Sequence, residues 1–483
     1  MSQDFYSVEK ITPLSKIPAG AKIHVIGVCG VAMAQLSVEL SKQGYEVSGS
    51  DKQFYEPMGS FLKSSAVRLC EGYSAENVPA DADLIIIGNA VSRDHVEVER
   101  TKELKLNYSC FPQILAEILI STKHSIVVAG THGKSTTTSM IASTLNGLSL
   151  DPSYFLGGIA HNLPSSFKIG SGPYSVVEGD EYDSAFFAKV PKFSFYKAKT
   201  CIVNAIEFDH ADIYQDVEAI KKEFLSLLQS LPADGAAICC SDYEHINSLL
   251  SELKGSDCKV LTFGTSSDSD YRIIERVTKG ELQLVKVESP QGEFHFTLPL
   301  IGQYNAKNAL ATIIVADVLG LDREKVKAEL VKYKGVKRRQ EVRFQNERIT
   351  VIEDFAHHPT SIKGTLEAVS ESYPGKKIWA IFEPRSNTSR MSVFQAEYCE
   401  IFKSSDVTII RDVPLRAGED SARIIDVDSI CKQLNHPTFH SEKVAEIEDY
   451  ILENLTGNDL VVIMSNGSFD GLIDSLISSL SKS

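Results

Sequence analysis

The stretch VVAGTHGKSTTTSMI, residues 127–141, constrains the fold more than any other part of the chain. Two apolar β-branched residues lead into the glycine-rich segment Gly130-Thr131-His132-Gly133-Lys134-Ser135, and a helical pattern follows. This order of strand, glycine-rich turn and helix is typical of a phosphate-binding loop, because backbone N–H groups at a helix N-terminus favour an anion. Lys134 would add a positive charge, and Ser135 would offer a hydroxyl ligand to Mg²⁺.

The spacing of this segment differs from that of the usual phosphate loop. The pattern G-x-x-x-x-G-K-[ST] would place a glycine at position 128, where the chain has Val128. A strand–helix turn that contains Gly-Lys-Ser without binding a phosphate is therefore an open alternative at this point.

Length and charge limit the classes of protein that need to be considered. A chain of 483 residues is too long for one core, and two to four domains are expected. The net charge of −15 argues against a nucleic-acid-binding surface. The nine cysteines lack zinc-site spacing, the N-terminal region lacks the apolar core of a secretory signal, and no apolar run reaches bilayer length. We expect a soluble cytoplasmic protein, a monomer or weak homo-oligomer, without nucleic-acid or membrane partners.

Strand-like and helical patterns alternate along most of the chain. Residues 22–51 read as strand–helix–strand, and the alternation resumes after the phosphate loop and again after residue 337. Residues 255–300 look like a small β-rich excursion. This alternation predicts an α/β fold with parallel sheets throughout. The expected domains are residues 1–118, residues 119–336 with the phosphate loop, and residues 337–483.

A second glycine-rich turn lies near the N-terminus. The spacing Gly27-x-x-Gly30-x-x-Met33 imitates a dinucleotide-binding fingerprint in which Met33 replaces the third glycine. A functional turn of this kind would bind the diphosphate of a nucleotide, and Asp51 at the end of the next strand could reach a ribose hydroxyl. The alternative is a turn that only packs a strand against a helix.

Two acidic segments follow buried strands downstream of the phosphate loop. They are Glu178-Gly179-Asp180-Glu181-Tyr182-Asp183 and the segment 204–212, in which His210 stands between Asp209 and Asp212. In open α/β sheets, ligands collect at the carboxyl ends of the strands, and Mg²⁺ needs only one or two carboxylates beside the phosphates. These segments are therefore candidate metal ligands, with solvated loop tips as the alternative.

The last third of the chain carries basic candidates. Lys337-Arg338-Arg339 lies at the expected domain junction, and Arg385 follows a strand in the segment FEPRSNT. Arginine suits bidentate contacts with phosphate or carboxylate, so an arginine delivered onto a transferring phosphoryl group is one hypothesis. A solvated linker is the other.

With these segments in order, the chain resembles the Mur ligases, the ATP-dependent amide-forming enzymes of bacterial cell-wall synthesis. The resemblance spans about residues 22–475 and rests on GTHGKSTTT, VEGDEYDSAFF, NAIEFDHADIY, GQYNAKNAL, KRRQE, EDFAHHPT and MSNGSFDGL. The family's shortened loop, G-T-x-G-K-[ST], accounts for the missing glycine. The resemblance implies an N-terminal Rossmann-like UDP-binding domain, a central P-loop ATPase domain with a parallel sheet, and a C-terminal Rossmann-like domain that meets the amine substrate.

The resemblance also implies site residues, with ATP and Mg²⁺ as cofactors. The UDP-sugar site would comprise Gly27, Val28, Cys29, Gly30, Val31, Ala32, Met33, Asp51 and Asn89. The ATP site would comprise Gly130, Thr131, His132, Gly133, Lys134, Ser135, Thr136, Asn305, Asn308, Arg339 and Asp354. Ser135, Glu178 and His210 would hold metal, and Lys134, Glu178, His210 and Arg339 would be catalytic. Arg385, Ser386, Asn387, His357 and His358 would meet the peptide.

Within the family, the HHPT motif occurs in ligases that add L-alanine to UDP-N-acetylmuramate and in ligases that add a murein tripeptide, L-alanyl-γ-D-glutamyl-meso-diaminopimelate. The segments GVCG, IIGNAVSR and FEPRSNT follow the tripeptide-adding members. We therefore expect a ligase of peptidoglycan recycling that acts through an acyl phosphate. The alternatives are the alanine-adding ligase, a P-loop ATPase or kinase with a stable phosphate product, and a non-catalytic nucleotide-binding module.

Overall fold

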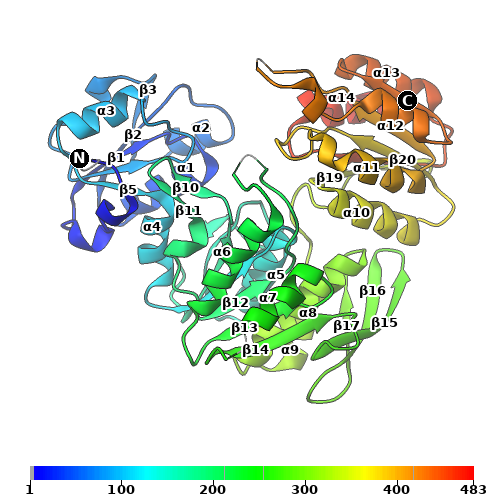
Figure 1. The fold of residues 1–483 in the computed structure, drawn as a ribbon, viewed down its shortest axis with the longest axis horizontal. Coiled ribbons are helices and arrows are strands. Elements are labelled where there is room, and N and C mark those ends of the chain that lie inside the picture. The colour runs from blue at the N-terminus through cyan, green and yellow to red at the C-terminus, as the bar shows by residue number, and fades with distance from the viewer. Residues whose placement is uncertain (1–4, 212, 254, 417, 483) are drawn as a thin grey trace.

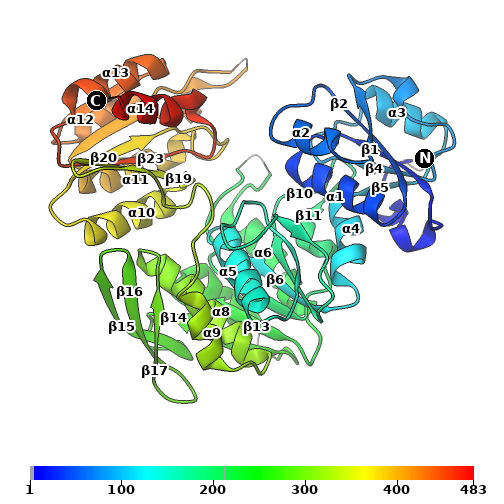
Figure 2. The ribbon, with the colours of Figure 1, turned by 180° about the vertical axis from the view of Figure 1, so that it is seen from behind.

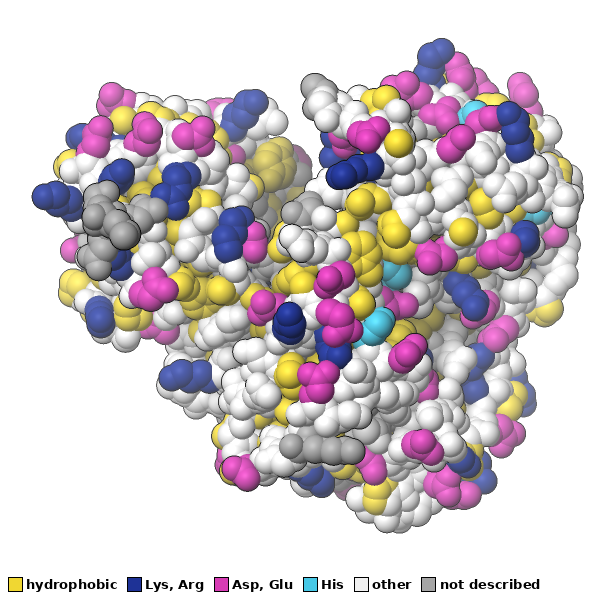
Figure 3. All heavy atoms as spheres, viewed as in Figure 1, with side chains coloured by type: hydrophobic (Ala, Val, Ile, Leu, Met, Phe, Trp, Pro, Cys, Tyr) yellow, Lys and Arg dark blue, Asp and Glu magenta, His cyan; other side chains and the backbone are white. Residues whose placement is uncertain are grey.

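A computed structural model describes residues 5–211, 213–253, 255–416 and 418–482. These residues form three α/β bodies, each with helices packed on a central sheet (Figure 1). The N-terminal and C-terminal bodies both adjoin the central body, and the view from behind shows the same arrangement (Figure 2). Figure 3 shows the surface hollowed between the N-terminal and C-terminal bodies. None of the described helices combines the length and apolar character that a membrane-spanning helix requires.

The N-terminal sheet is parallel, with the strand order β3-β2-β1-β4-β5. Its strands are β1 (Lys22–Ile26), β2 (Glu46–Asp51), β3 (Arg68–Glu71), β4 (Leu84–Ile87) and β5 (Tyr108–Cys110), and its helices are α1 (Val31–Lys42), α2 (Met58–Lys63) and α3 (Val96–Glu103). The sequence LIII of β4 is buried throughout, as expected of a parallel strand covered on both faces. The strand order reverses between β1 and β4, so the segments after these two strands flank the topological switch point, where such sheets bind ligands.

The central sheet has the order β17-β16-β15-β14-β13-β12-β6-β9-β7-β8. Its strands are β6 (His124–Ala129), β7 (Ser153–Phe155), β8 (Phe167–Lys168), β9 (Tyr174–Gly179), β12 (Thr200–Val203), β13 (Ala236–Cys240), β14 (Lys259–Gly264), β15 (Tyr271–Lys279), β16 (Leu282–Glu288) and β17 (Phe294–Leu298). Its helices are α5 (Lys134–Gly147), α6 (Val217–Gln229), α7 (Glu244–Glu252), α8 (Gln303–Val318) and α9 (Arg323–Leu330). Strand β6, which leads into the phosphate loop, is parallel to both of its neighbours, β9 and β12. The two acidic segments that follow β9 and β12 therefore flank the loop.

The C-terminal sheet has the order β18-β19-β23-β20-β21-β22. Its strands are β18 (Glu341–Gln345), β19 (Ile349–Asp354), β20 (Lys377–Phe382), β21 (Val407–Arg411), β22 (Thr438–Ser441) and β23 (Asp459–Met464), and its helices are α10 (Pro359–Ser372), α11 (Gln395–Ile401), α12 (Val427–Gln433), α13 (Val444–Asn454) and α14 (Leu472–Leu480). The candidate segments HHPT and FEPRSNT follow β19 and β20, and the segment after β23 lies between them in the sheet.

The predicted α/β class is confirmed, but the prediction of parallel sheets throughout is wrong at the edges. Strands β15, β16 and β17 pair antiparallel, as do β7 with β8 and β18 with β19. No helix separates β15 from β16 or β16 from β17. A parallel pair needs a long crossover, whereas a short turn forces an antiparallel pair. The β-rich segment near residues 255–300 thereby extends the central sheet.

The hydrophobic core joins the first two bodies. One cluster contains Leu36 of α1 and Met140 of α5, while two further clusters lie on the C-terminal sheet, and one of these also includes Ile301 of the central body. The hairpin of β10 (Asp183–Ala185) and β11 (Ala188–Pro191) belongs to the central segment by sequence, yet Phe187 at its tip packs with Tyr6 and Tyr108 of the N-terminal body. The domain limits 1–118, 119–336 and 337–483 stay predictions.

Candidate functional site

The glycine-rich loop after β6 has the geometry of a phosphate-binding loop. Helix α5 begins at Lys134, and its N-cap Gly133 has a left-handed φ of 78° that favours glycine. Gly130, with φ 119°, lies so close to β12 that an added Cβ would be 2.8 Å from the backbone nitrogen of Ala205. The Thr131 N–H donates to the Ala205 carbonyl over 2.9 Å. The loop is therefore fastened to the end of β12, and both glycines are required by the backbone.

Lys134 is held at this loop by a buried carboxylate. Its Nζ lies 2.8 Å from Oε2 of Glu181 and donates to the Gly130 carbonyl, also over 2.8 Å. Burial alone would lower the pKa of Lys134, but the negative charges of Glu181 and Asp180 outweigh it and raise the pKa. Lys134 is therefore positively charged where a phosphate would approach the loop.

Glu178 faces the first residues of α5. Its Oε2 accepts a hydrogen bond from the Ser135 hydroxyl over 2.9 Å, and its Oε1 accepts one from the Gly157 N–H over 2.6 Å. Burial and the nearby charge of Asp180 raise the pKa of Glu178, so its negative charge is poorly compensated by the protein. A buried carboxylate beside a hydroxyl is a donor set that fits Mg²⁺.

His210 lies on the segment after β12 and points to the same carboxylate as Lys134. It has a left-handed φ of 53°, unusual for a residue other than glycine, and its N–H donates to Oδ1 of Asp209 over 2.7 Å. Its Nε2 is 3.3 Å from Oε1 of Glu181. Burial acts to lower the pKa of His210, but the hydrogen bond with Glu181 and the nearby carboxylates raise it. The metal role of His210 stays a prediction, and Asp212 lies outside the described residues.

Lys192, a buried residue that the sequence analysis missed, contacts this acidic segment. Lys192 lies 3.0 Å from Oδ2 of Asp180 and 2.9 Å from the Tyr182 hydroxyl, with its ammonium 4.2 Å from the centroid of that tyrosine ring. Tyr182 in turn packs on His210, with ring centroids 5.4 Å apart. The charge of Lys192 thus positions both Asp180 and the aromatic ring behind His210.

The junction between the central and C-terminal bodies presents Arg339. Its neighbours Arg338 and Gln340 both have left-handed φ values, 61° and 52°. The Arg338 side chain is fixed in the C-terminal body through Glu353, 2.7 Å away. The guanidinium groups of Arg338 and Arg339 both lie over the Phe355 ring, 5.2 Å and 4.5 Å from its centroid.

A cavity of about 620 Å³ lies between the phosphate loop and the C-terminal body. Its lining includes the predicted ATP-site residues His132, Gly133, Ser135, Thr136, Asn305, Asn308, Arg339 and Asp354. Gly130, Thr131 and Lys134 lie in the loop behind this wall. An added Cβ on Gly133 would be 2.8 Å from Oδ1 of Asn308, so this asparagine packs against the phosphate loop. The cavity brings most of the predicted ATP-site residues together, and their roles stay predictions.

The far wall of the cavity holds side chains that sequence reasoning missed. Lys307 of α8 lies 3.2 Å from Asp242 and 5.0 Å from the centroid of the Tyr243 ring. Asp242 and Tyr243 lie just beyond β13, whose sequence AAICC is buried. The rule that ligands collect at the carboxyl ends of strands, applied to this strand as well, would have found them.

The first glycine turn is fastened by Asp51. The carboxylate accepts hydrogen bonds from the Cys29 N–H over 2.8 Å and from the Tyr73 hydroxyl over 3.1 Å. Val28 and Cys29 are buried, so these residues would present backbone groups rather than side chains to a UDP-sugar. Asn89 is exposed after β4, and Gly88 before it donates its N–H to the Ile26 carbonyl. The turn and Asn89 thus lie together at the switch point of the sheet, and the ribose contact of Asp51 stays a prediction.

Among the five predicted UDP-site residues that remain, Gly27 and Gly30 shape the turn. Gly27 has a left-handed φ of 79°, and Gly30 is the N-cap of α1. Met33 is buried, Ala32 is half-buried, and Val31 is 48% exposed at the start of the helix. Val31 therefore offers an apolar surface beside the turn.

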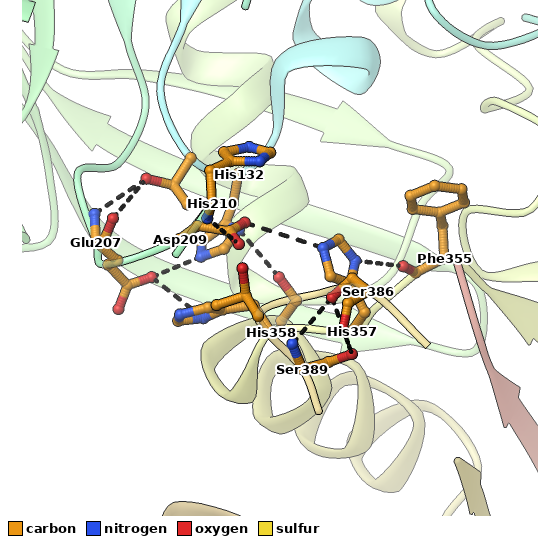
Figure 4. A network of polar contacts seen from close by, with 12 residues as sticks. His132, Glu207, Asp209, His210, Phe355, His357, His358, Ser386 and Ser389 are labelled. Carbon is orange, nitrogen blue, oxygen red and sulfur yellow. Dashed lines mark hydrogen bonds and ion pairs between the residues drawn. The ribbon is translucent and has the colours of Figure 1, made fainter. Parts of the chain in front are cut away.

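The predicted peptide residues lie on the loop after β20 and at the start of α10. Arg385 and Asn387 are exposed, and Asn387 accepts a hydrogen bond from Arg416 over 2.9 Å. The Ser386 hydroxyl donates to the Ser389 hydroxyl over 2.8 Å, and both serines lie near His357 (Figure 4). The structure therefore brings Ser386 and His357 into one region.

His357 and His358 reach across to the central body. Nε2 of His358 lies 3.2 Å from the Phe208 carbonyl, and Nε2 of His357 lies 3.9 Å from Oδ2 of Asp209 (Figure 4). Burial lowers the pKa of both histidines. The segment after β12 is therefore shared between the phosphate loop and the C-terminal body.

Three family profiles match successive parts of the chain. They are described as Mur ligase family, catalytic domain, over residues 22–123, Mur ligase middle domain, over residues 128–316, and Mur ligase, glutamate ligase domain, over residues 338–467. A UDP-N-acetylmuramate–L-alanyl-γ-D-glutamyl-meso-2,6-diaminoheptandioate ligase of Haemophilus influenzae is 32% identical over 459 residues, covering 95% of this chain and 99% of that protein. The chain belongs to the Mur ligase family. The resemblance found in the sequence is thereby confirmed.

Other Mur ligases are similar over comparable lengths. A UDP-N-acetylmuramate–L-alanine ligase of Sulfurihydrogenibium is also 32% identical, covering 95% of this chain and 98% of that protein. The crystal structure of a murein peptide ligase from Psychrobacter arcticus has a TM-score of 0.70 at 30% identity, covering 96% of this chain and 99% of that one. That of a UDP-N-acetylmuramate–alanine ligase from Thermotoga maritima has a TM-score of 0.76 at 25% identity, with the same coverage. As a Mur ligase, the protein is an ATP-dependent enzyme that forms an amide bond.

Proposed function

We propose that this Mur ligase joins the tripeptide L-alanyl-γ-D-glutamyl-meso-diaminopimelate to UDP-N-acetylmuramate, with conversion of ATP to ADP and phosphate, in peptidoglycan recycling. The proposal that Lys134 and His210 are catalytic rests on one observation. At the carboxyl end of β6, Glu181 contacts both Lys134 and His210. This is the place in an α/β sheet where a nucleotide triphosphate and its metal are expected.

The proposed chemistry follows from the weakness of a carboxylate as an acyl donor. The lactyl carboxylate of the sugar attacks the γ-phosphorus of ATP, the bond to ADP breaks, and an acyl phosphate forms. The amino group of the peptide then attacks the acyl carbon, and phosphate leaves as the amide forms. Lys134 and Arg339 stabilise the negative charge on the transferring phosphoryl group.

Ser135 and Glu178 would hold the Mg²⁺ ion. Its chemistry would be to neutralise charge on the phosphate oxygens. The hydrogen bond of 2.9 Å between the Ser135 hydroxyl and Glu178 keeps these two oxygen ligands together at the start of α5. Lys134, Glu178, His210 and Arg339 are accordingly the residues that we propose as catalytic.

The attacking amine must lose a proton, and His357 is the candidate acceptor. Burial lowers the pKa of His357, so the ring is neutral near pH 7 and can take a proton. The Nδ1 atom lies 3.1 Å from the Phe355 carbonyl, to which a ring N–H donates, and this leaves the Nε2 lone pair available. Nε2 is the atom that points to Asp209, whose charge would stabilise the protonated ring.

The choice of the tripeptide rests on the relatives and on the loop after β20. Two ligases named for this tripeptide substrate, from Haemophilus influenzae and Escherichia coli, match 95% of the chain at 32% identity. Arg385 is exposed on that loop, and a guanidinium suits the carboxylates of such a peptide. L-Alanine ligases match at the same identity, so an alanine acceptor is the second candidate. A cytoplasmic location and a monomeric or weakly associated state are part of the proposal.

Phosphate release decides between these substrates. Purified full-length protein would receive ATP, Mg²⁺ and UDP-N-acetylmuramate, with either the tripeptide or L-alanine as the acceptor. Turnover with the tripeptide and little with alanine supports the proposal, and the reverse preference identifies the alanine-adding enzyme. Phosphate release that needs neither acceptor would indicate a plain ATPase. A matched reaction without UDP-N-acetylmuramate measures the background.

A further inference from the structure

We propose that His132, Glu207 and His358 bind a divalent transition-metal cation of the Zn²⁺ class, at a site separate from the Mg²⁺ ligands. The three residues come from the phosphate loop, from the segment after β12 and from the N-cap of α10. One ligand atom from each lies within 4.8 Å of the other two. Figure 4 shows the three side chains directed toward one another across the boundary between the central and C-terminal bodies.

The spacing of the ligand atoms suits such an ion after small movements. Nε2 of His132 lies 2.7 Å from Oε2 of Glu207, and Nδ1 of His358 lies 3.9 Å from the same oxygen. Zn²⁺ binds nitrogen and oxygen at about 2.0–2.2 Å, so tetrahedral ligands are about 3.3 Å apart. Nε2 of His132 must therefore move away from Oε2 of Glu207 by roughly 0.6 Å, and Nδ1 of His358 must move toward it by roughly the same distance. Rotation of the side chains can supply both movements.

Contacts around the three residues orient them as metal ligands are usually oriented. Nε2 of His358 faces the Phe208 carbonyl at 3.2 Å and must carry the proton, because a carbonyl only accepts. The lone pair of His358 is therefore on Nδ1, the atom that faces Glu207. Metal-bound histidines commonly donate their other ring N–H to a carbonyl in this way.

The other two ligands have similar support from α10. The Thr360 hydroxyl donates to Oε1 of Glu207 over 2.7 Å, which leaves Oε2 facing the two histidines. The Ser361 hydroxyl lies 3.3 Å from Nδ1 of His132, which directs Nε2 toward Glu207. Two contacts compete with the ion, and it would replace both. They are the long contact of the Thr360 N–H with Nδ1 of His358, at 3.3 Å, and the hydrogen bond between Nε2 of His132 and Oε2 of Glu207, at 2.7 Å.

The protonation states of two ligands are those that a metal needs. Burial lowers the pKa of His358 to about 4, so the ring is neutral at pH 7. Burial would raise the pKa of Glu207, but the hydrogen bond and charge of His132 lower it to about 2. Nε2 of His132 faces the carboxylate of Glu207 and carries a proton there, so the ion requires the other tautomer, with the proton on Nδ1 beside the Ser361 hydroxyl.

The donor set determines the class of cation. Two imidazole nitrogens and one carboxylate oxygen favour Zn²⁺ and similar ions, whereas Mg²⁺ prefers oxygen ligands. Such an ion would tie the phosphate loop to the C-terminal body through His132 and His358. Under the proposed function, products leave only when these bodies separate, so bound Zn²⁺ is expected to slow turnover.

The test is a titration with Zn²⁺ alone, without nucleotide or substrate, so that its failure is distinct from failure of the proposed function. Calorimetry on the full chain should give one Zn²⁺ site, and Co²⁺ should show the visible absorption of a tetrahedral complex. His358→Gln and Glu207→Gln should each weaken binding at least tenfold. His440→Gln, which removes a half-buried histidine 2.9 Å from Asp412, and Glu178→Gln at the Mg²⁺ site are the matched controls and should retain Zn²⁺ binding. Unchanged binding in His358→Gln and Glu207→Gln, or loss in Glu178→Gln, overturns the proposal.

A second measurement keeps the proposal testable if either ligand variant misfolds, which far-ultraviolet circular dichroism would reveal. The X-ray absorption spectrum of the Zn²⁺-loaded wild-type protein reports its ligands directly. Two imidazoles and an oxygen ligand support the assignment. A sulfur ligand would place the ion at one of the nine free cysteines and contradict it.

Discussion

The ammonium of Lys134 and the carboxylate of Glu181 form a buried ion pair, with Nζ 2.8 Å from Oε2. The Glu181 side chain is only 1% exposed, and its other oxygen lies 3.3 Å from Nε2 of His210. A buried carboxylate is strongly stabilised by two such partners and strongly destabilised when it loses them. Glu181 therefore couples the lysine of the phosphate loop to the histidine on the segment after β12.

Glu181→Gln should lower kcat by roughly 10²–10³ while the protein stays folded, because Lys134 and His210 lose the shared charge that orients them. Phosphate release at saturating substrates measures this effect. Glu400→Gln, at an exposed glutamate paired with Lys403, is the control and should behave as the wild type. A wild-type kcat in Glu181→Gln would show that the pair has no catalytic role.

Lys192→Met should lower the free energy of unfolding by about 3–5 kcal/mol, since it leaves the buried Asp180 without its partner. Urea denaturation followed by circular dichroism measures the loss. Adding Asp180→Asn to Lys192→Met should restore part of the stability, because the uncompensated charge is then gone. Lys189→Met, at an exposed lysine paired with Asp183, should change stability by less than about 1 kcal/mol. Equal effects of the two lysine variants would contradict this account.

The contact between His358 and the central body should weaken on acidification. The pKa of His358 is about 4 in the folded protein because of burial, against an ordinary value near 6.5, so below pH 6.5 the unfolded chain binds a proton that the folded chain does not. The free energy of unfolding should fall as pH drops from about 6.5 to 4, by on the order of 3 kcal/mol. Glu207, with a pKa lowered to about 2 chiefly by His132 against the effect of burial, should add a further loss below about pH 4.3.

The fluorescence of Trp379, the single tryptophan of the chain and buried in β20, follows unfolding of the C-terminal body. Urea titrations at pH 7, 5.5 and 4 on wild type and His358→Gln would measure the pH dependence. The variant should lose most of the slope between pH 6.5 and 4. Parallel curves for the two proteins would rule out His358 as its source.

Arg385→Ala should raise the KM for the tripeptide about tenfold, with the KM values for ATP and UDP-N-acetylmuramate nearly unchanged, because a charged hydrogen bond to a carboxylate is worth about 1.5–3 kcal/mol. Steady-state kinetics with each substrate varied in turn provides the test. Arg423→Ala, at another exposed arginine of the same body, is the matched control. An equal rise in all three KM values would point to a general structural effect.

Local patterns in the sequence were enough to predict the strand, glycine-rich loop and helix at residues 124–147 and the parallel core of each sheet. The loop is one continuous segment, and strands buried on both faces have apolar sequences such as LIII in β4. The antiparallel edge of the central sheet was missed for a different reason. Residues 255–300 were predicted to be β-rich, but parallel pairing was expected throughout, and no helix lies between β15, β16 and β17 to make the crossovers that parallel pairs need.

The contacts between residues of the site could not be predicted from the spacing of these residues in the sequence, because the contacts depend on how the chain turns between them. Glu178 and Glu181 lie three residues apart, yet the first contacts Ser135 and the second contacts Lys134, because β9 ends at Gly179 and the chain then turns. Lys192 reaches Asp180 only because the intervening hairpin of β10 and β11 folds back. His132, Glu207 and His358 meet from segments 75 and more residues apart.

The continuous core shared by the first two bodies has a mechanical consequence. Leu36 and Met140 belong to one hydrophobic cluster. The C-terminal body has two other clusters, one of which includes Ile301 of the central body, and it also meets the central body at the junction of Arg338 and Gln340 and through the polar contacts of His357 and His358. The N-terminal and central bodies therefore form one unit with a shared core, to which the C-terminal body is attached across a separate boundary. A compound bound at this boundary would block movement of the C-terminal body relative to the other two without resembling any of the three substrates.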